Sequence, residues 1–241
     1  MKTTISHLKH FTIILLCFAA IASTGQTETN ATKNKRLSGG FGYFSLSGEQ
    51  LNLNDLNRSL SALGYTSFNT MATSFGGGGL FSINNFLLGG GGASLNSQNV
   101  YNETNAINLK GGYGFFNFGY IVYSGKRSVL YPAIGLGAGG YSLSIRKKNL
   151  PGNFTQQLNT PEGMVTTEVS GRMLNLELNY LLFLRKEKTG FYLGFKAGYK
   201  YSPQSWETKL VHASLTNSPN MNMNGFYASI LIGGGGLSQT K

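Results

Sequence analysis

The chain has 241 residues, of which 41% are hydrophobic, only 12% are charged and 34 are glycine. Its formal net charge of +11 is spread thinly along the sequence, which argues against the dense basic face that nucleic-acid binding requires. The single cysteine, Cys17, lies in an N-terminal leader, and the histidines are few, so we expect no disulfide, metal site or cofactor in the mature protein.

The first 25 residues have the order of a secretory signal peptide. Lys2 and Lys9 supply a positive start, a short apolar stretch covers residues 11–21, and small residues follow. That stretch is too short to span a bilayer, and no later apolar run reaches 18 residues, so we expect export and no transmembrane helix. The expected organisation is a signal peptide (1–25), an N-terminal segment (26–35) and one folded domain (36–241).

A first strand near residues 36–46 is followed by a segment with helical periodicity. Residues 51–64 place four leucines on one helical face, with Asn52 or Asn54 as the expected N-cap and Gly64 as the C-terminal stop. We expect this short helix to cover one open end of the fold. A membrane surface or a partner protein is an alternative contact for its apolar face.

Asn84-Asn85 joins two strands predicted near 70–83 and 86–97. Each of these strands contains a block of four consecutive glycines. If Ile83 pairs with Phe86, the two blocks face each other across a tight hairpin. Glycine permits the strong curvature of a small barrel, which is the interpretation we favour. Alternatively it makes room, either inside for bulky rings or outside for a lipid chain or a partner. The predicted glycine band comprises Gly77, Gly78, Gly79, Gly90, Gly91 and Gly92.

Two further strands, near 104–123 and 128–147, change the phase of their apolar face partway along. Such a change indicates either a β-bulge or the point at which the strand leaves a membrane.

The strands near 165–184 and 190–202 have the clearest period of two. In LNLELNYLLFL (174–184) leucine and tyrosine alternate with asparagine and glutamate, and a polar turn joins this strand to FYLGFKAGYKY (191–201). A last strand is predicted near 221–236. The eight strands are joined by connections that alternate between short and long, which is typical of a transmembrane β-barrel.

The signal peptide, the LNLELNY/FYLGFKAGYKY hairpin and this rhythm of connections resemble the small eight-stranded outer-membrane barrels of Gram-negative bacteria, the OmpA/OmpX-like group. The resemblance implies an all-β fold: an eight-stranded antiparallel transmembrane β-barrel with short periplasmic turns, long outer loops and one short helix in the first loop. It also implies residence in the outer membrane, contact with outer-membrane lipid and insertion by the barrel assembly machinery, with no nucleic-acid partner.

The polar face of the hairpin formed by strands 165–184 and 190–202 predicts a cluster of charges in the barrel lumen. Pairing Leu184 with Phe191 sets Glu177 diagonal to Lys196 and Lys200, and a buried carboxylate needs such partners. We expect a packed polar core, with a selectivity ring for anions as the alternative. The predicted lumen charge cluster comprises Glu177, Lys196, Lys200, Arg172 and Lys110.

The sequence therefore predicts a non-enzymatic, surface-exposed envelope protein whose loops bind a surface or an extracellular ligand. A narrow passive channel for small or anionic solutes is the first alternative. A lipid-modifying enzyme is another, because His212 and Ser214 resemble the His-x-Ser motif of lipid A deacylases, although no acidic residue follows them. A soluble, lipocalin-like exported barrel, with its apolar face inward, is the last.

Overall fold

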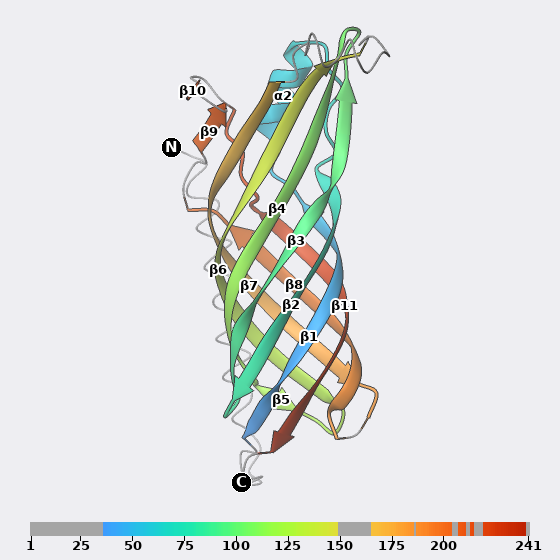
Figure 1. The fold of residues 1–241 in the computed structure, drawn as a ribbon, viewed down its shortest axis with the longest axis vertical. Coiled ribbons are helices and arrows are strands. Elements are labelled where there is room, and N and C mark those ends of the chain that lie inside the picture. The colour runs from blue at the N-terminus through green and yellow to red at the C-terminus, as the bar shows by residue number, and fades with distance from the viewer. Residues whose placement is uncertain are drawn as a thin grey trace, which may run out of the picture. The chain divides into compact units, whose positions relative to one another are not determined.

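The computed structural model describes residues 36–148, 165–185, 187–203, 207–210, 213–214 and 219–239. The expected signal peptide and N-terminal segment lie outside these residues. One antiparallel sheet dominates the described part, and its long strands wrap into a closed barrel (Figure 1). Among the described residues, no helix has the length and apolar character needed to cross a membrane.

Eight long strands form the ring, as predicted. Each pairs with two neighbours, and β1 closes the barrel by pairing with both β2 and β11. Short strands β5 (Tyr123–Ser124), β9 (Glu207–Leu210) and β10 (Ala213–Ser214) extend the sheet at its ends. In ring order, the long strands are β1 (Leu37–Gln50), β2 (Met71–Ile83), β3 (Phe86–Tyr101), β4 (Asn105–Tyr120), β6 (Ser128–Lys147), β7 (Val165–Phe183), β8 (Thr189–Tyr201) and β11 (Gly225–Gln239).

The β2–β3 hairpin turns on two residues with left-handed backbone, Asn84 (φ 53°) and Asn85 (φ 74°). Two positive φ angles give a turn whose twist matches that of the strands. Ile83 pairs with Phe86, so Gly79, Gly78 and Gly77 face Gly90, Gly91 and Gly92, the register expected from the sequence.

We expect Asn84→Val to lower the free energy of unfolding by about 1–2 kcal/mol, because a β-branched residue resists the left-handed conformation. Asn84→Gly is the matched control and should be neutral, since glycine adopts this conformation freely. Urea titration of the barrel folded into lipid vesicles would measure both. Equal loss in the two variants would show that the asparagine side chain, and not its backbone, matters here.

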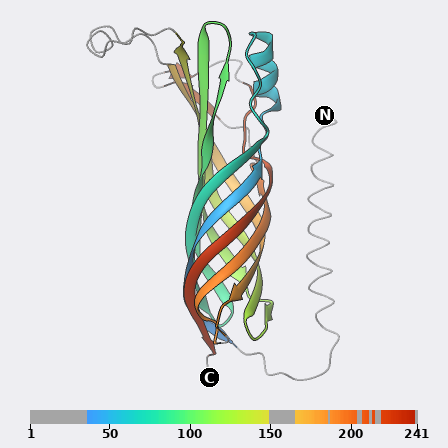
Figure 2. The same cartoon turned by 90° about the vertical axis from the view of Figure 1, so that its right-hand side faces the viewer.

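Two apolar clusters fill the ends of the barrel interior. We call the end with the two-residue turn at 84–85 the lower end, and the end with the helix α2 (Asn54–Ala62) the upper end (Figure 2). The lower cluster includes Leu37, Leu87, Val129, Phe183 and Leu237, all buried. The upper cluster joins inward residues of the strands to Leu53, Leu56 and Leu60 of the helical segment and to Met221 and Met223, which precede β11.

Helix α2 lies at the upper end and packs on the upper apolar cluster, but its details differ from the prediction. Leu53, not an asparagine, takes the N-cap position, and no side chain caps the helix. Leu63 is the one leucine of the expected stripe that stays exposed, because the helix has ended before it; Gly64 follows with φ +76°. The three buried leucines, Leu53, Leu56 and Leu60, pack the helix against the upper apolar cluster.

Strands β4 and β6 pair in unbroken register, from Asn105 with Lys147 to Gly119 with Ala133. The phase change therefore involves no bulge between β4 and β6. A register shift occurs on the other side of β4, in its pairing with β3, between Leu95 and Gln98. Instead, the apolar side switches from the inner face in the upper half to the outer face in the lower half. Ile107 and Leu109 are buried, whereas Phe116 and Phe118 of the same strand are exposed.

Candidate functional site

Between the two apolar clusters, the middle of the lumen holds a layer of polar side chains. We call it the polar layer. It has two groups: Glu49, Ser74, Tyr113 and Lys200 form the upper group, and Tyr43, Asn175, Glu177, Asn179, Lys196 and Tyr227 form the lower group.

The upper group is built on an ion pair between Glu49 of β1 and Lys200 of β8, both with fully buried side chains. Ser74 and Tyr113 donate hydrogen bonds to the same carboxylate oxygen, the second at 2.6 Å. The Lys200 ammonium also lies 4.0 Å from the centre of the Tyr113 ring. A buried carboxylate with one cation and two hydroxyl donors is well satisfied, so this pair ties together four strands.

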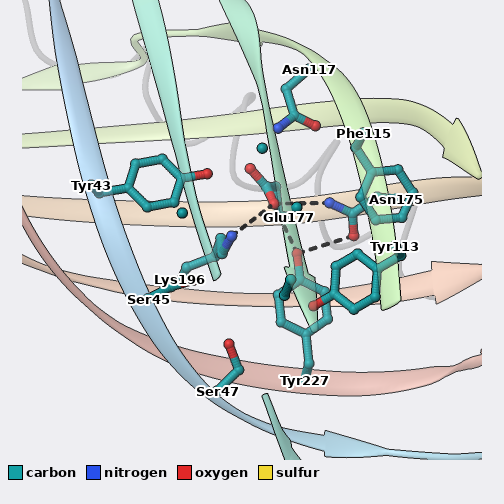
Figure 3. A pocket seen from close by; sticks show the side chains of 14 residues that line it. Tyr43, Ser45, Ser47, Tyr113, Phe115, Asn117, Asn175, Glu177, Lys196 and Tyr227 are labelled. Atoms are coloured by element: carbon teal, nitrogen blue, oxygen red, sulfur yellow. Dashed lines mark hydrogen bonds and ion pairs between the residues drawn. The ribbon is translucent and has the colours of Figure 1, made fainter. Parts of the chain in front are cut away.

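The lower group surrounds Glu177, whose side chain is 2% exposed. Asn175 and Tyr227 each donate a hydrogen bond of 2.8 Å to its carboxylate (Figure 3). Asn179 donates a third, at 3.1 Å. The Lys196 ammonium lies 3.8 Å from the same carboxylate and 5.2 Å from the centre of the Tyr43 ring.

The space left between these side chains is small. The cavity lined by Tyr43, Asn117, Glu177 and Lys196 has a volume of about 20 Å³. About one water molecule fits in such a volume. The polar layer is therefore packed, and the apolar clusters close the lumen above and below it.

The structure brings three of the five residues of the predicted lumen charge cluster into this layer: Glu177, Lys196 and Lys200. Lys110 and Arg172 do not join them, since both side chains are exposed on the outer face. Each occupies the opposite side of its strand from the buried residues, with Leu109 and Met173 as the inward neighbours.

Sequence reasoning missed Glu49, the partner of Lys200. The first strand was expected to end near residue 46, whereas β1 continues to Gln50. Glu49 keeps the inward parity of Tyr43, Ser45 and Ser47, so extending the alternation by two steps would have found it.

The glycine band is divided between the two faces of the sheet. Gly78 and Gly91 face inward, where a Cβ atom would lie 2.8 and 2.9 Å from the Tyr43 hydroxyl. Gly79 and Gly90 alternate with them and face outward, as do Gly77 and Gly92. The inward pair thus leaves the space that the Tyr43 ring occupies, just as Gly198 does for Tyr227, where the corresponding distance is 2.8 Å.

Large apolar side chains project outward around the lower part of the barrel. Phe44 is 82% exposed and Phe191 is 73% exposed. Soluble proteins rarely expose so many large apolar side chains on one continuous surface. We call this surface the apolar belt. It includes Phe44, Leu46, Phe75, Phe81, Phe116, Phe118, Ile134, Leu136, Leu182, Phe191, Leu193, Phe195, Phe226, Ile230 and Ile232.

The weak His-x-Ser motif lies at the edge of the described residues. His212 lies outside them, and of Ser214 only the backbone, in β10, is described. Within the described ranges, no three His, Cys, Asp or Glu side chains come close enough to hold a metal ion.

No known protein-family model matches the sequence, and no curated protein matches it. Several solved structures are similar in fold. The attachment invasion locus protein Ail of Yersinia pestis is 10% identical, with a TM-score of 0.43, over 84% of this chain and 99% of that one. Ail has also been solved in complex with the heparin analogue sucrose octasulfate.

Two other outer-membrane proteins show the same degree of likeness. OprG of Pseudomonas aeruginosa is 8% identical, with a TM-score of 0.47, over 83% of this chain and 97% of that one. The outer membrane protease OmpT of Escherichia coli is 12% identical, with a TM-score of 0.37, over 90% of this chain and all of that one. The chain resembles small outer-membrane β-barrels in fold, and its function has to be argued from its own residues.

Proposed function

We propose that this protein is a non-enzymatic outer-membrane β-barrel with a closed lumen, which anchors α2 and the upper strand ends at the cell surface. The observation that carries the proposal is the combination of an outward apolar belt with a packed interior whose middle layer is polar and charged. A soluble lipocalin-like barrel would show the reverse, with a water-facing exterior and an apolar cavity for its ligand.

The height of the apolar belt fits a bilayer. On β7 and the turn that follows, the outward positions from Leu174 to Leu184 are leucine except for Tyr180. Ten steps along a strand tilted as in known barrels cover a height of about 25 Å, the thickness of the apolar band in such proteins. Secretion by the signal peptide (1–25) and insertion by the barrel assembly machinery would deliver the chain to the outer membrane.

Membrane insertion is tested by fractionating cells that express the full chain and running the membrane fraction on a gel with and without boiling. We expect the protein in the outer membrane, with faster migration when unboiled because the closed barrel resists detergent. Recovery in the soluble periplasm or the medium would contradict the proposal and favour the lipocalin-like alternative.

The closed lumen leads to a second expectation, which concerns ion conductance. Because the polar layer leaves space for about one water molecule and both ends are packed with apolar side chains, the purified barrel should show no ion conductance in a planar bilayer. Lys196→Gln, which removes the charge without adding a second carboxylate beside Glu177, should leave the trace unchanged. Steady single-channel currents whose ion preference shifts in Lys196→Gln would instead support the channel alternative.

A further inference from the structure

A groove of about 350 Å³ crosses the outer face of β4, β6 and β7 in the upper half of the barrel. Its side walls carry Lys110, Ser142, Glu168 and Ser170. Its floor is backbone at Gly112 and Gly140, which pair with each other across β4 and β6. No residue of the lumen site lies in it.

The groove exists because the outward row across these three strands has almost no side chains. Gly112 pairs with Gly140, and Gly140 pairs with Ser170. The row above holds Lys110, Ser142 and Glu168, which are also paired neighbours. Long side chains above a row of glycines leave a hollow that faces the surroundings of the barrel.

Its height coincides with the upper edge of the apolar belt. Two rows below the glycine row, the outward residues are Phe116, Leu136 and Leu174, which belong to the apolar side of the wall. Above the glycine row the outward residues of the next two rows are all polar: Lys110, Ser142 and Glu168, then Asn108, Ser144 and Thr166. In a membrane, this border is the level of lipid headgroups in the outer leaflet.

The charges at the groove suit an anionic, hydroxylated ligand. Lys110 borders it from above, and Arg172 follows Ser170 on the outward face of β7, one row below the glycine row. A lysine and an arginine on two sides of a hollow can bind phosphate groups. Glu168, Ser142 and Ser170 offer acceptors and donors for sugar hydroxyls.

We propose that this groove binds the phosphorylated saccharide headgroup of a glycolipid in the outer leaflet. One phosphate group contacts Lys110 in the groove and a second contacts Arg172 below it, the sugar contacts Glu168 and Ser170, and the acyl chains descend along the apolar belt. A bare acyl chain would make no polar contact with Lys110 or Glu168 in the walls of the groove. The inference rests on the proposed membrane location.

Native mass spectrometry of the folded, detergent-solubilised full-length barrel, titrated with diphosphoryl lipid A, tests this proposal. We expect one retained lipid A, bound about tenfold more tightly than phosphatidylglycerol, because two cations and several hydroxyl groups act together. The double variant Lys110→Glu/Arg172→Glu should lose about tenfold or more in apparent affinity. Lys126→Glu, which makes the same kind of charge change at an exposed lower turn, is the control.

A steric variant gives independent evidence. Gly112→Leu fills the groove, whereas Gly114→Leu adds the same side chain two residues further along the same outer face, where the nearest atom to a Cβ is 3.8 Å away. We expect lipid A retention to fall only in Gly112→Leu. The unboiled gel shift of each sample reports whether its barrel is closed.

Equal retention in all variants, or equally tight binding of phosphatidylglycerol, would overturn the groove assignment while a normal gel shift leaves the proposed function standing. A wild-type protein that does not fractionate with the outer membrane would overturn the proposed function instead.

Discussion

Replacing Lys200 by methionine is expected to lower the free energy of unfolding by about 3–5 kcal/mol, because the Glu49 carboxylate then stays fully buried without its cation. The remaining donors, Ser74 and Tyr113, cannot balance a full negative charge in this surrounding. The loss should appear in urea titrations of the barrel folded into phosphatidylcholine vesicles, read from the gel shift of the unboiled protein.

The double variant Glu49→Gln/Lys200→Met separates a charge effect from a packing effect. Removing both charges should recover most of the lost stability, since a buried pair replaced as a unit costs little. Lys126→Met, at an exposed turn, should unfold at the wild-type urea concentration. If Lys200→Met itself unfolds like the wild type, the buried pair contributes nothing to holding the ring closed.

The second large effect is expected at the glycines beneath Tyr43. Gly91→Ala places a Cβ atom 2.9 Å from the Tyr43 hydroxyl and 3.0 Å from the Gly77 carbonyl oxygen, so the packed lumen must shift. We expect a loss of about 1–3 kcal/mol, the usual cost of overpacking. The same urea titration measures it.

Gly79→Ala is the matched control, because Gly79 faces outward and the nearest atom to its added Cβ is 3.6 Å away. It should leave stability close to that of the wild type. Adding Tyr43→Phe to Gly91→Ala removes the hydroxyl and should restore part of the loss. Equal effects at Gly79 and Gly91 would mean that both glycines serve the curvature of the sheet, as the sequence interpretation favoured, and not the space inside.

Alternation of side chains was sufficient to predict the eight strands and the register of both tight hairpins. Once one pair beside a turn is known, every further pair follows, so Glu177 was correctly placed diagonal to Lys196 and Lys200, on either side of its partner Gly198. The assignment of faces was weaker. Arg172 shares its parity with Leu174 and Leu176 and therefore faces outward with them. The alternation of leucines along β7 indicates that Arg172 faces outward, and the charge-pairing argument did not use this alternation.

The upper end of the barrel was beyond sequence reasoning for a different reason. Leu53, Leu56 and Leu60 were predicted to share a helical face, but Met221 and Met223 complete the same apolar cluster from a segment more than 150 residues away. A single bridge between Asn52 and Asn222 brings these segments together. Local periodicity carries no information about such a distant contact, because it depends on closure of the whole ring.

The polar layer also has a consequence for how the barrel assembles. Glu49 and Lys200 are 151 positions apart in the sequence. Their strands, β1 and β8, both pair with β11, the last strand of the ring in chain order. Separate hairpins leave the two charges apart, so their pairing stabilises only the complete ring. Contacts that form this late act mainly on the rate of opening. Once shut, the barrel should stay shut for a long time, and loss of the pair should shorten that lifetime far more than it slows insertion.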